Sequence, residues 1–403
     1  MTKFYWLSGF VGLYWAYCLY WGFKGARSAK TSTDYFLAGR SIGVWVFVLA
    51  ATATSFSGWT FVGHPGKIFT DGLPYAFASF YALTIPFTGV LFLRRQWVLG
   101  KAFRYITPGE MYSDYYGGNA MRLLTVLVAF LFSVPYLGVQ LRASGSLFNV
   151  LSDGFISVNF GMVALTTVVV VYVASGGLRS VAYVDCAQAI LLAIGIAILG
   201  GVTLYYLGGW SGFTIGLAHI VSSDVSSGQN LTPDGYSMKV AIPGSIQMVS
   251  AGSKAMGGAW TGIMCMTYMF ALMGIQSSPA FSMWAFSNKT SRAFRWQQVV
   301  ASSIVVGIIL FTFTIIQGLG GHVLIEQGVI ESATDKNLIP QLINLLSESA
   351  PWLVGLLAVC ALAAMQSTGA AYMSTFSAMF TKDVYTRYIS KKASDNELSL
   401  IHI

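Results

Sequence analysis

Small polar residues and helix breakers interrupt two long apolar stretches of this sequence. The stretch 42–63 contains the run ATATSFSGW, with Ser57-Gly58 near its middle, and the stretch 258–287 contains GIQSSP. Unwound backbone inside a membrane is costly unless it lines a cavity or binds a ligand. Paired interruptions in separated spans are typical of inverted-repeat transporters, whose half-helix ends coordinate substrate and sodium. The alternative is helix packing through small residues, which explains the first stretch alone equally well.

A third stretch, 351–380, carries the hydroxyls of Ser367 and Thr368 among small and apolar residues. Alkali cations need several neutral oxygen ligands, and hydroxyls with unwound carbonyls supply them without a buried full charge. Serine and threonine in membrane helices also bond back to their own backbone, and on spacing alone that packing role is favoured. The residue types are therefore compatible with a cation site but do not require one.

The composition indicates a membrane protein. Of 403 residues, 55% are hydrophobic and 9% are charged, whereas ordinary soluble domains have about 25% charged residues. The apolar residues form blocks of about 20, the length that crosses a bilayer core. The four cysteines stand singly and the four histidines are scattered, so neither a disulfide framework nor a metal site is supported. We expect an all-α polytopic membrane protein that is not an enzyme and has no cofactor.

The apolar blocks predict nine membrane spans, at 4–23, 42–63, 73–93, 121–150, 156–174, 183–208, 258–287, 297–323 and 351–380. With the N-terminus outside, 17 of the Lys and Arg residues fall inside and 6 outside. A wrong number of spans would scramble this alternation, so the asymmetry supports nine crossings. The formal charge of +8 then sets topology and contacts anionic lipid headgroups, and nucleic acid is not an expected partner.

The chain is predicted to form one transmembrane transporter domain, 1–389. Its longest loop, 209–257, is rich in Ser, Gly, Asp and Asn and is expected to be an external cap or short surface helices. The polar tail 390–403 is expected to be cytoplasmic.

Four motifs in order resemble the sodium:solute symporter family, which includes sodium/glucose, sodium/proline and sodium/sialic acid symporters. They are DYFLAGRS (34–41), SFSGW with GHPGKIF (55–69), YVASGGLRS with VAYVDCAQ (172–188), and AAMQSTGAAYMSTFSAMFTKDVY (363–385). The resemblance covers about 34–389. It implies a core of two inverted five-helix repeats after one extra N-terminal helix, with 42–63 and 258–287 as the first helices of the repeats. Because family members continue with at least two more core helices, the second repeat is expected to be truncated here.

The resemblance also implies the site residues, carried over by position. Sodium would bind between 42–63 and 351–380, at the carbonyls of Ala53, Phe56 and Ala364 and the hydroxyls of Ser367 and Thr368. The solute would lie against Ser55, Ser57, Trp59, Tyr136, Gln140, Gln276, Ser277 and Ser278. The sodium/proline branch has an aspartate where this chain has Ser55, and GIQSSP departs from the G.P.. pattern of relatives, so their substrates do not carry over.

The implied function is secondary active transport in the cell inner (plasma) membrane, in which inward sodium movement drives uptake of a small organic solute by alternating access. The expected partners are sodium, the solute and the lipid bilayer. The candidate pocket is neutral and polar, which suits an amino acid, a sugar, a carboxylate or a vitamin. Two alternatives remain: the transporter-like sensor region of a histidine kinase, and an inactive fragment of a symporter.

Overall fold

The computed structural model describes residues 2–228, 239–245, 248–249 and 260–390. Among these residues the backbone is helical apart from turns and one isolated bridge between Ile42 and Asn288. The helices are α1 (Thr2–Ala26), α2 (Ser32–Leu37), η1 (Ala38–Arg40), α3 (Val44–Ser55), η2 (Trp59–Gly63), α4 (His64–Asp71), α5 (Leu73–Ala78), α6 (Tyr81–Phe103), α7 (Pro108–Tyr116), α8 (Asn119–Leu151), α9 (Val158–Tyr206), α10 (Gly209–Ser227), α12 (Gly262–Met273), η3 (Gly274–Ser277), α13 (Pro279–Ser287), α14 (Arg292–Arg295), η4 (Trp296–Val306), α15 (Gly307–Ile309), η5 (Leu310–Thr314), α16 (Ile315–Glu326), α17 (Leu338–Asn344), α18 (Pro351–Met379) and η6 (Phe380–Ile389). The prediction of an all-helical protein is confirmed for this part of the chain.

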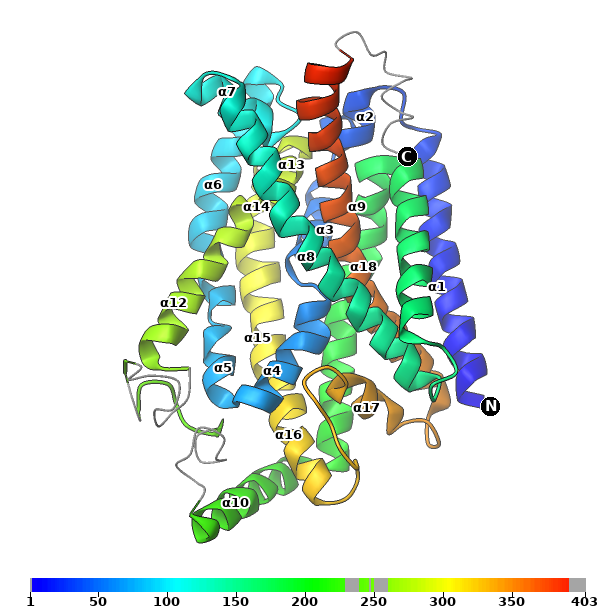
Figure 1. The fold of residues 1–403 in the computed structure, drawn as a ribbon, viewed down its shortest axis with the longest axis vertical. Helices are drawn as coiled ribbons and strands as arrows, with labels where there is room; N and C mark the ends of the chain where they lie inside the picture. Colours follow the sequence, from blue (N-terminus) through cyan, green and yellow to red (C-terminus); the bar gives the residue numbers. More distant parts are fainter. Residues whose placement is uncertain (1, 229–238, 246–247, 250–259, 391–403) are drawn as a thin grey trace.

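Within the described residues, five helical segments are long and apolar enough to cross a membrane, and six if the bent pair Val44–Ser55 and Trp59–Asp71 counts as one span. They form an upright bundle in which α18 lies across the middle, with α2 and α7 at one end and α10 and α17 at the other (Figure 1). In the best apolar window of the Pro351–Ile389 segment, 89% of the residues are buried. This burial inside the bundle explains why α18 carries small residues along its length.

The helix α9 contains two predicted spans. It has 49 residues, with non-helical backbone at Gly177, and at about 1.5 Å per residue it is far longer than one crossing requires. Figure 1 shows it running up beside α1 and then turning back down toward α10. The Ser180 hydroxyl donates to the Tyr172 carbonyl across the turn at 3.1 Å. The YVASGGLRS motif is therefore the turn between two antiparallel arms.

Gly177 is required for this turn. Its φ of 58° and ψ of −158° lie in a region that only glycine readily adopts, and a Cβ would stand 2.4 Å from the Tyr35 carbonyl oxygen. We expect Gly177→Ala to lower the free energy of unfolding by about 3 kcal/mol or more, seen as a lower melting temperature of the purified protein. The matched control is Gly201→Ala in the same helix, where a Cβ meets nothing within 4 Å. Equal melting temperatures of the two variants would contradict this role.

The DYFLAGRS motif stabilises the α2 end of the bundle through hydrogen bonds. Asp34 forms a capping box with Thr31 at the start of α2. Arg40 donates to three carbonyls that belong to different segments: Gly100, Tyr105 and Phe286. Burial lowers the pKa of this guanidinium, while the nearby Glu110 carboxylate raises it. The motif thus holds the start of α3 against α6 and α13.

The external loop predicted at 209–257 contains α10, a 19-residue helix. It lies at the end of the bundle away from α2 (Figure 1) and contacts α16 and α9. The location of this loop outside the membrane stays a prediction. Residues 229–238, 246–247 and 250–259 of the loop, and 391–403 of the predicted tail, lie outside the described residues.

Candidate functional site

The first interrupted stretch is a broken helix. α3 ends at Ser55, Phe56 has extended backbone (φ −116°, ψ 97°), and the helix resumes at Trp59 with its axis bent by 53°. Before the break, the hydroxyls of Thr52, Thr54 and Ser55 each bond to the carbonyl four residues earlier, which satisfies them inside an apolar helix. The break falls at the predicted place. It interrupts the regular backbone hydrogen bonds of the helix.

Three of the five predicted sodium residues, Ala53, Ala364 and Ser367, meet where α3 contacts α18. The Ser367 hydroxyl lies 3.0 Å from the Ala53 carbonyl oxygen and 3.1 Å from the Ala364 carbonyl oxygen. Thr368, the next residue, is fully buried, and its hydroxyl has no hydrogen-bond partner among the described residues. Phe56 is also fully buried, directly after α3. Neutral oxygens from two helices are thus gathered without a carboxylate, which is a donor set suited to an alkali cation rather than a divalent one.

The residues after the break face α8. The Tyr136 hydroxyl donates to the Ser57 hydroxyl at 3.0 Å, and the Gly58 N–H donates to the Gln140 side-chain oxygen at 3.0 Å. The side-chain nitrogen of Gln140 is buried with no partner among the described residues. Unsatisfied buried donors are costly, so this amide is available to a polar ligand beside the break.

Only some of the predicted solute residues in the second broken helix, α12–η3–α13, lie at the junction with the first. The Gln276 amide nitrogen lies 3.4 Å from the Ser55 hydroxyl, and Ser278 lies 3.5 Å from the Tyr372 hydroxyl. Ser277, in contrast, is exposed. The two broken helices also touch through a bond from the Trp284 indole nitrogen to Thr54 at 3.1 Å. The structure therefore gathers the predicted solute residues Ser55, Ser57, Trp59, Tyr136, Gln140, Gln276 and Ser278 around one junction, with Ser277 facing outward.

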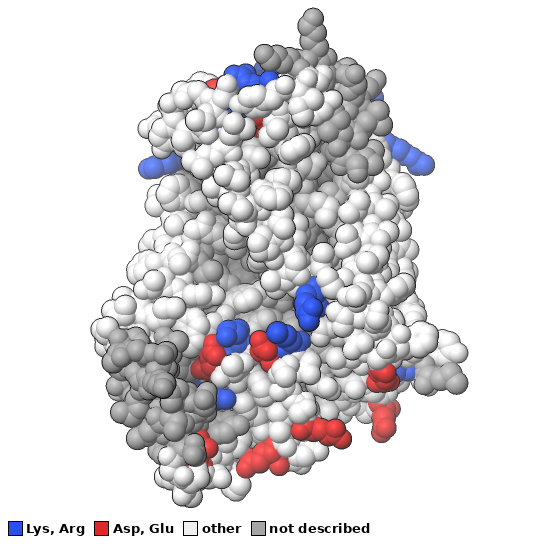
Figure 2. Space-filling model, viewed as in Figure 1, with Lys and Arg blue, Asp and Glu red and all other residues white. Residues whose placement is uncertain are grey.

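A cavity of about 790 Å³ reaches the break at Gly58 and Trp59. Aromatic rings form one wall: Tyr75 packs edge-on against Trp260 with centroids 4.7 Å apart, and Trp260 against Tyr268 at 5.4 Å. Figure 2 shows a hollow on this face with Lys, Arg and acidic side chains gathered beside it. This volume is within the range of small-molecule sites.

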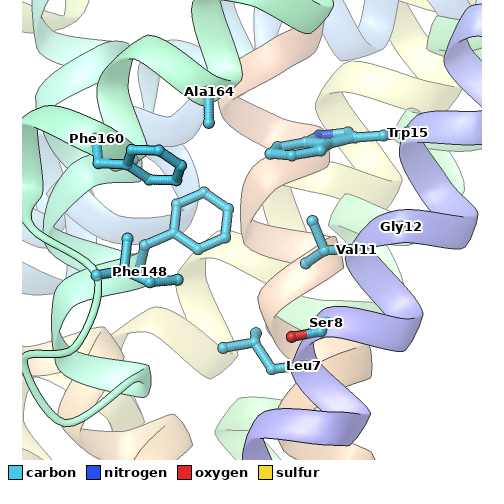
Figure 3. A pocket seen from close by; sticks show the side chains of 10 residues that line it. Leu7, Ser8, Val11, Gly12, Trp15, Phe148, Phe160 and Ala164 are labelled. Carbon is cyan, nitrogen blue, oxygen red and sulfur yellow. The ribbon is translucent and has the colours of Figure 1, made fainter.

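A second cavity, of about 220 Å³, lies between α1, the end of α8 and the start of α9 (Figure 3). Phe148, Phe160 and Trp15 turn their rings into it, and Ser8 supplies a hydroxyl at one edge. Its apolar lining offers little to a cation or a polar solute. The described residues contain no group of three or more His, Cys, Asp or Glu side chains able to hold a metal ion.

The sequence assigned no role to two sets of buried polar residues. Gln297 and Gln298 are fully buried. Gln298 donates to the Gln276 oxygen at 3.0 Å and so supports the second broken helix, whereas Gln297 donates to Thr52 of α3 at 3.4 Å. The two adjacent amide side chains in an apolar span could have indicated this role, because buried amides need hydrogen-bond partners. Asp185 on α9 is fully buried, and both of its oxygens are unpartnered among the described residues.

The comparisons with known proteins fit this geometry. The family model described as sodium:solute symporter family matches residues 35–403. The chain belongs to the sodium:solute symporter family. The resemblance seen in its four motifs is thus confirmed, and with it the assignment to membrane proteins of sodium transport and symport.

Among curated relatives, the high-affinity proline transporter PutP of Bacillus subtilis is 26% identical over 94% of this chain and 73% of its own length. The sodium/proline symporter of Escherichia coli is 25% identical over 94% of this chain and 70% of its own length. A substrate-bound, outward-open structure of a Na⁺-coupled sialic acid symporter matches with a TM-score of 0.76 and 17% identity, covering 100% of this chain and 78% of that one. The last likeness shows the shared fold. The family and these relatives are transporters rather than enzymes.

Proposed function

We propose that the protein couples inward sodium movement to uptake of a small organic solute by alternating access in the inner (plasma) membrane. Family membership supports sodium-coupled solute uptake, and the named relatives carry proline or sialic acid. The observation that carries the proposal is the oxygen cluster of Ser367, Ala53 and Ala364, together with the adjacent residue Thr368, whose hydroxyl has no partner among the described residues. Sodium at this cluster would satisfy Thr368 and bridge α3 to α18.

In this mechanism the chain forms one transporter domain of nine crossings, 1–389, with the tail 390–403 in the cytoplasm. The two broken helices begin two inverted repeats. Sodium binds first at Ala53, Phe56, Ala364, Ser367 and Thr368. Solute then binds at Ser55, Ser57, Trp59, Tyr136, Gln140, Gln276 and Ser278, without the exposed Ser277. Inward sodium movement supplies about 2.3 kcal/mol per charge per 100 mV, in addition to its concentration gradient.

The bridging role of sodium gives a test that needs no knowledge of the solute. A ligand that binds only the folded state stabilises it by about 1.4 kcal/mol at ten times its Kd. We expect NaCl to raise the melting temperature of the purified protein by a few degrees more than choline chloride or KCl at the same ionic strength. Identical melting curves in the three salts up to molar concentration would refute a sodium site in this chain.

A further inference from the structure

The cavity in front of the break is lined by an unusual set of charges for the outer side of a membrane protein. Lys67, Arg142 and Lys336 line it, together with the single carboxylate of Asp335. In the predicted topology only six Lys and Arg residues are outside, the others being Lys3, Lys239 and Lys254. Half of the outer cations therefore surround one cavity. Basic residues on this side work against the charge bias that sets topology, so topology does not explain their position.

The partners of these cations differ. Lys67 is paired with Asp71 at 3.0 Å, and Asp71 also accepts from the Trp260 indole at 2.8 Å. Arg142 and Lys336 are exposed and have no hydrogen-bond or ion-pair partner among the described residues. With Lys67 paired to Asp71, the other charged lining residues are Arg142, Lys336 and Asp335, which leaves a net charge of +1. A planar guanidinium with free donors is suited to a carboxylate, which it can bind through two parallel hydrogen bonds.

Arg142 also has a suitable position along the path to the break. It lies on the face of α8 that lines the cavity, one turn from Gly138 and one turn from Ser146, and Gly58 of the break lines the same cavity. The rings of Trp59, Tyr75 and Trp260 line the same cavity as Arg142. Low-dielectric walls around charges of one sign focus the field and raise the local concentration of ligands of the opposite sign. The cavity thus combines an apolar wall with a net positive rim.

We propose that this cavity is an anion-selecting vestibule and that the solute is a small organic anion whose carboxylate is first held by Arg142, with Lys336 adding to the attraction. This rests on the proposed function for its link to transport. The electrostatic potential of the vestibule does not depend on transport, so it is tested separately from the proposed function.

The first experiment measures the sign of the potential with cysteine reagents of opposite charge. Ser146 lines the cavity, and Ser227 on α10 is exposed away from it. In the full chain, Ser146→Cys and Ser227→Cys are each treated with sulfonatoethyl (anionic) and trimethylammonioethyl (cationic) methanethiosulfonate, and the unmodified parent corrects for the four native cysteines. We expect the ratio of the modification rates, anionic over cationic reagent, to be about tenfold higher in Ser146→Cys than in Ser227→Cys.

The charged side chains are then tested in the Ser146→Cys background. Adding Arg142→Gln and Lys336→Gln should remove the difference, while Lys3→Gln should not. Equal ratios at the two positions would overturn the proposal.

The second experiment identifies the recognised group. Lactate and succinate are compared with lactamide and succinamide as protectants of Ser146→Cys against the cationic reagent, in choline and in sodium buffers. We expect each acid to protect at a concentration at least about tenfold lower than its amide, and Arg142→Gln to abolish the difference. Equal effects of acid and amide, including no protection by either, would overturn the carboxylate assignment. Failure of sodium to stabilise the protein, with acid-selective protection intact, would instead refute the proposed function alone.

Discussion

Ser367→Ala combined with Thr368→Ala is expected to abolish sodium-stimulated uptake while the protein still accumulates in the membrane. The Ser367 hydroxyl contacts the Ala53 and Ala364 carbonyls, and both hydroxyls are completely buried. Hydrogen bonds and contacts to a charged group contribute about 1.5–3 kcal/mol each, so losing two oxygens costs at least about 3 kcal/mol, or about 100-fold in sodium affinity. The measurement is solute uptake, or the sodium-dependent melting shift, as a function of sodium concentration.

Two controls separate ion binding from packing in α18. Thr368→Ser keeps the oxygen and should keep the sodium response, whereas Thr368→Val keeps the shape and should lose it. Ser374→Ala removes another buried hydroxyl of the same helix that has no partner in the described part of the chain, and it should leave the response intact. An unchanged sodium dependence in the double variant would rule out this site.

The stability of Thr368→Val without sodium gives an independent check. Because its hydroxyl has no partner among the described residues, replacing it with a methyl group removes a desolvation cost and no hydrogen bond. We therefore expect the sodium-free melting temperature to stay level or rise, while the increase caused by sodium disappears. A packing role for Thr368 would instead lower the melting temperature in every salt.

The helices and their interruptions could be predicted because the signals are local. Apolar blocks of membrane-spanning length and breakers such as Ser57-Gly58 act through the nearest turns of the chain, and each of the nine predicted spans coincides with helical segments where the structure describes it. The turn at Gly177 likewise separates two spans that were predicted apart. The place of these residues along the apolar stretches was therefore sufficient to predict the spans, the break and the turn.

The contacts between the elements could not be predicted in this way. The bond from Trp284 to Thr54 joins residues 230 positions apart, and the support of Gln276 by Gln298 depends on how two helices pack. The vestibule charges come from α4, α8 and the segment before α17, and each one alone reads as an ordinary loop or helix-end charge. Only the packed structure shows that they share a cavity.

Gly58→Ala is expected to abolish transport for a reason that links the break to the sodium site. An added Cβ would stand 2.5 Å from Met365 Cγ, 2.6 Å from Gln140 Oε1 and 3.3 Å from Met365 Cα. The methionine side chain can move, but the α18 backbone can yield only if α3 and α18 separate. That movement would carry the Ala53 carbonyl away from Ser367, and a displacement of about 1 Å in such a site can cost about 100-fold in rate.

The measurement for Gly58→Ala is the sodium dependence of both uptake and melting temperature, compared with Gly43→Ala, where a Cβ at the start of the same span meets nothing within 4 Å. Met365→Ala added to Gly58→Ala removes the nearest obstructing atom and should restore part of the sodium response, which a general folding defect would not allow. Wild-type sodium affinity in Gly58→Ala would show that the break tolerates a side chain and that α3 and α18 are not held at a fixed distance by the ion. Loss of sodium response with partial rescue would instead mean that the close approach at Gly58 sets the geometry in which sodium binds.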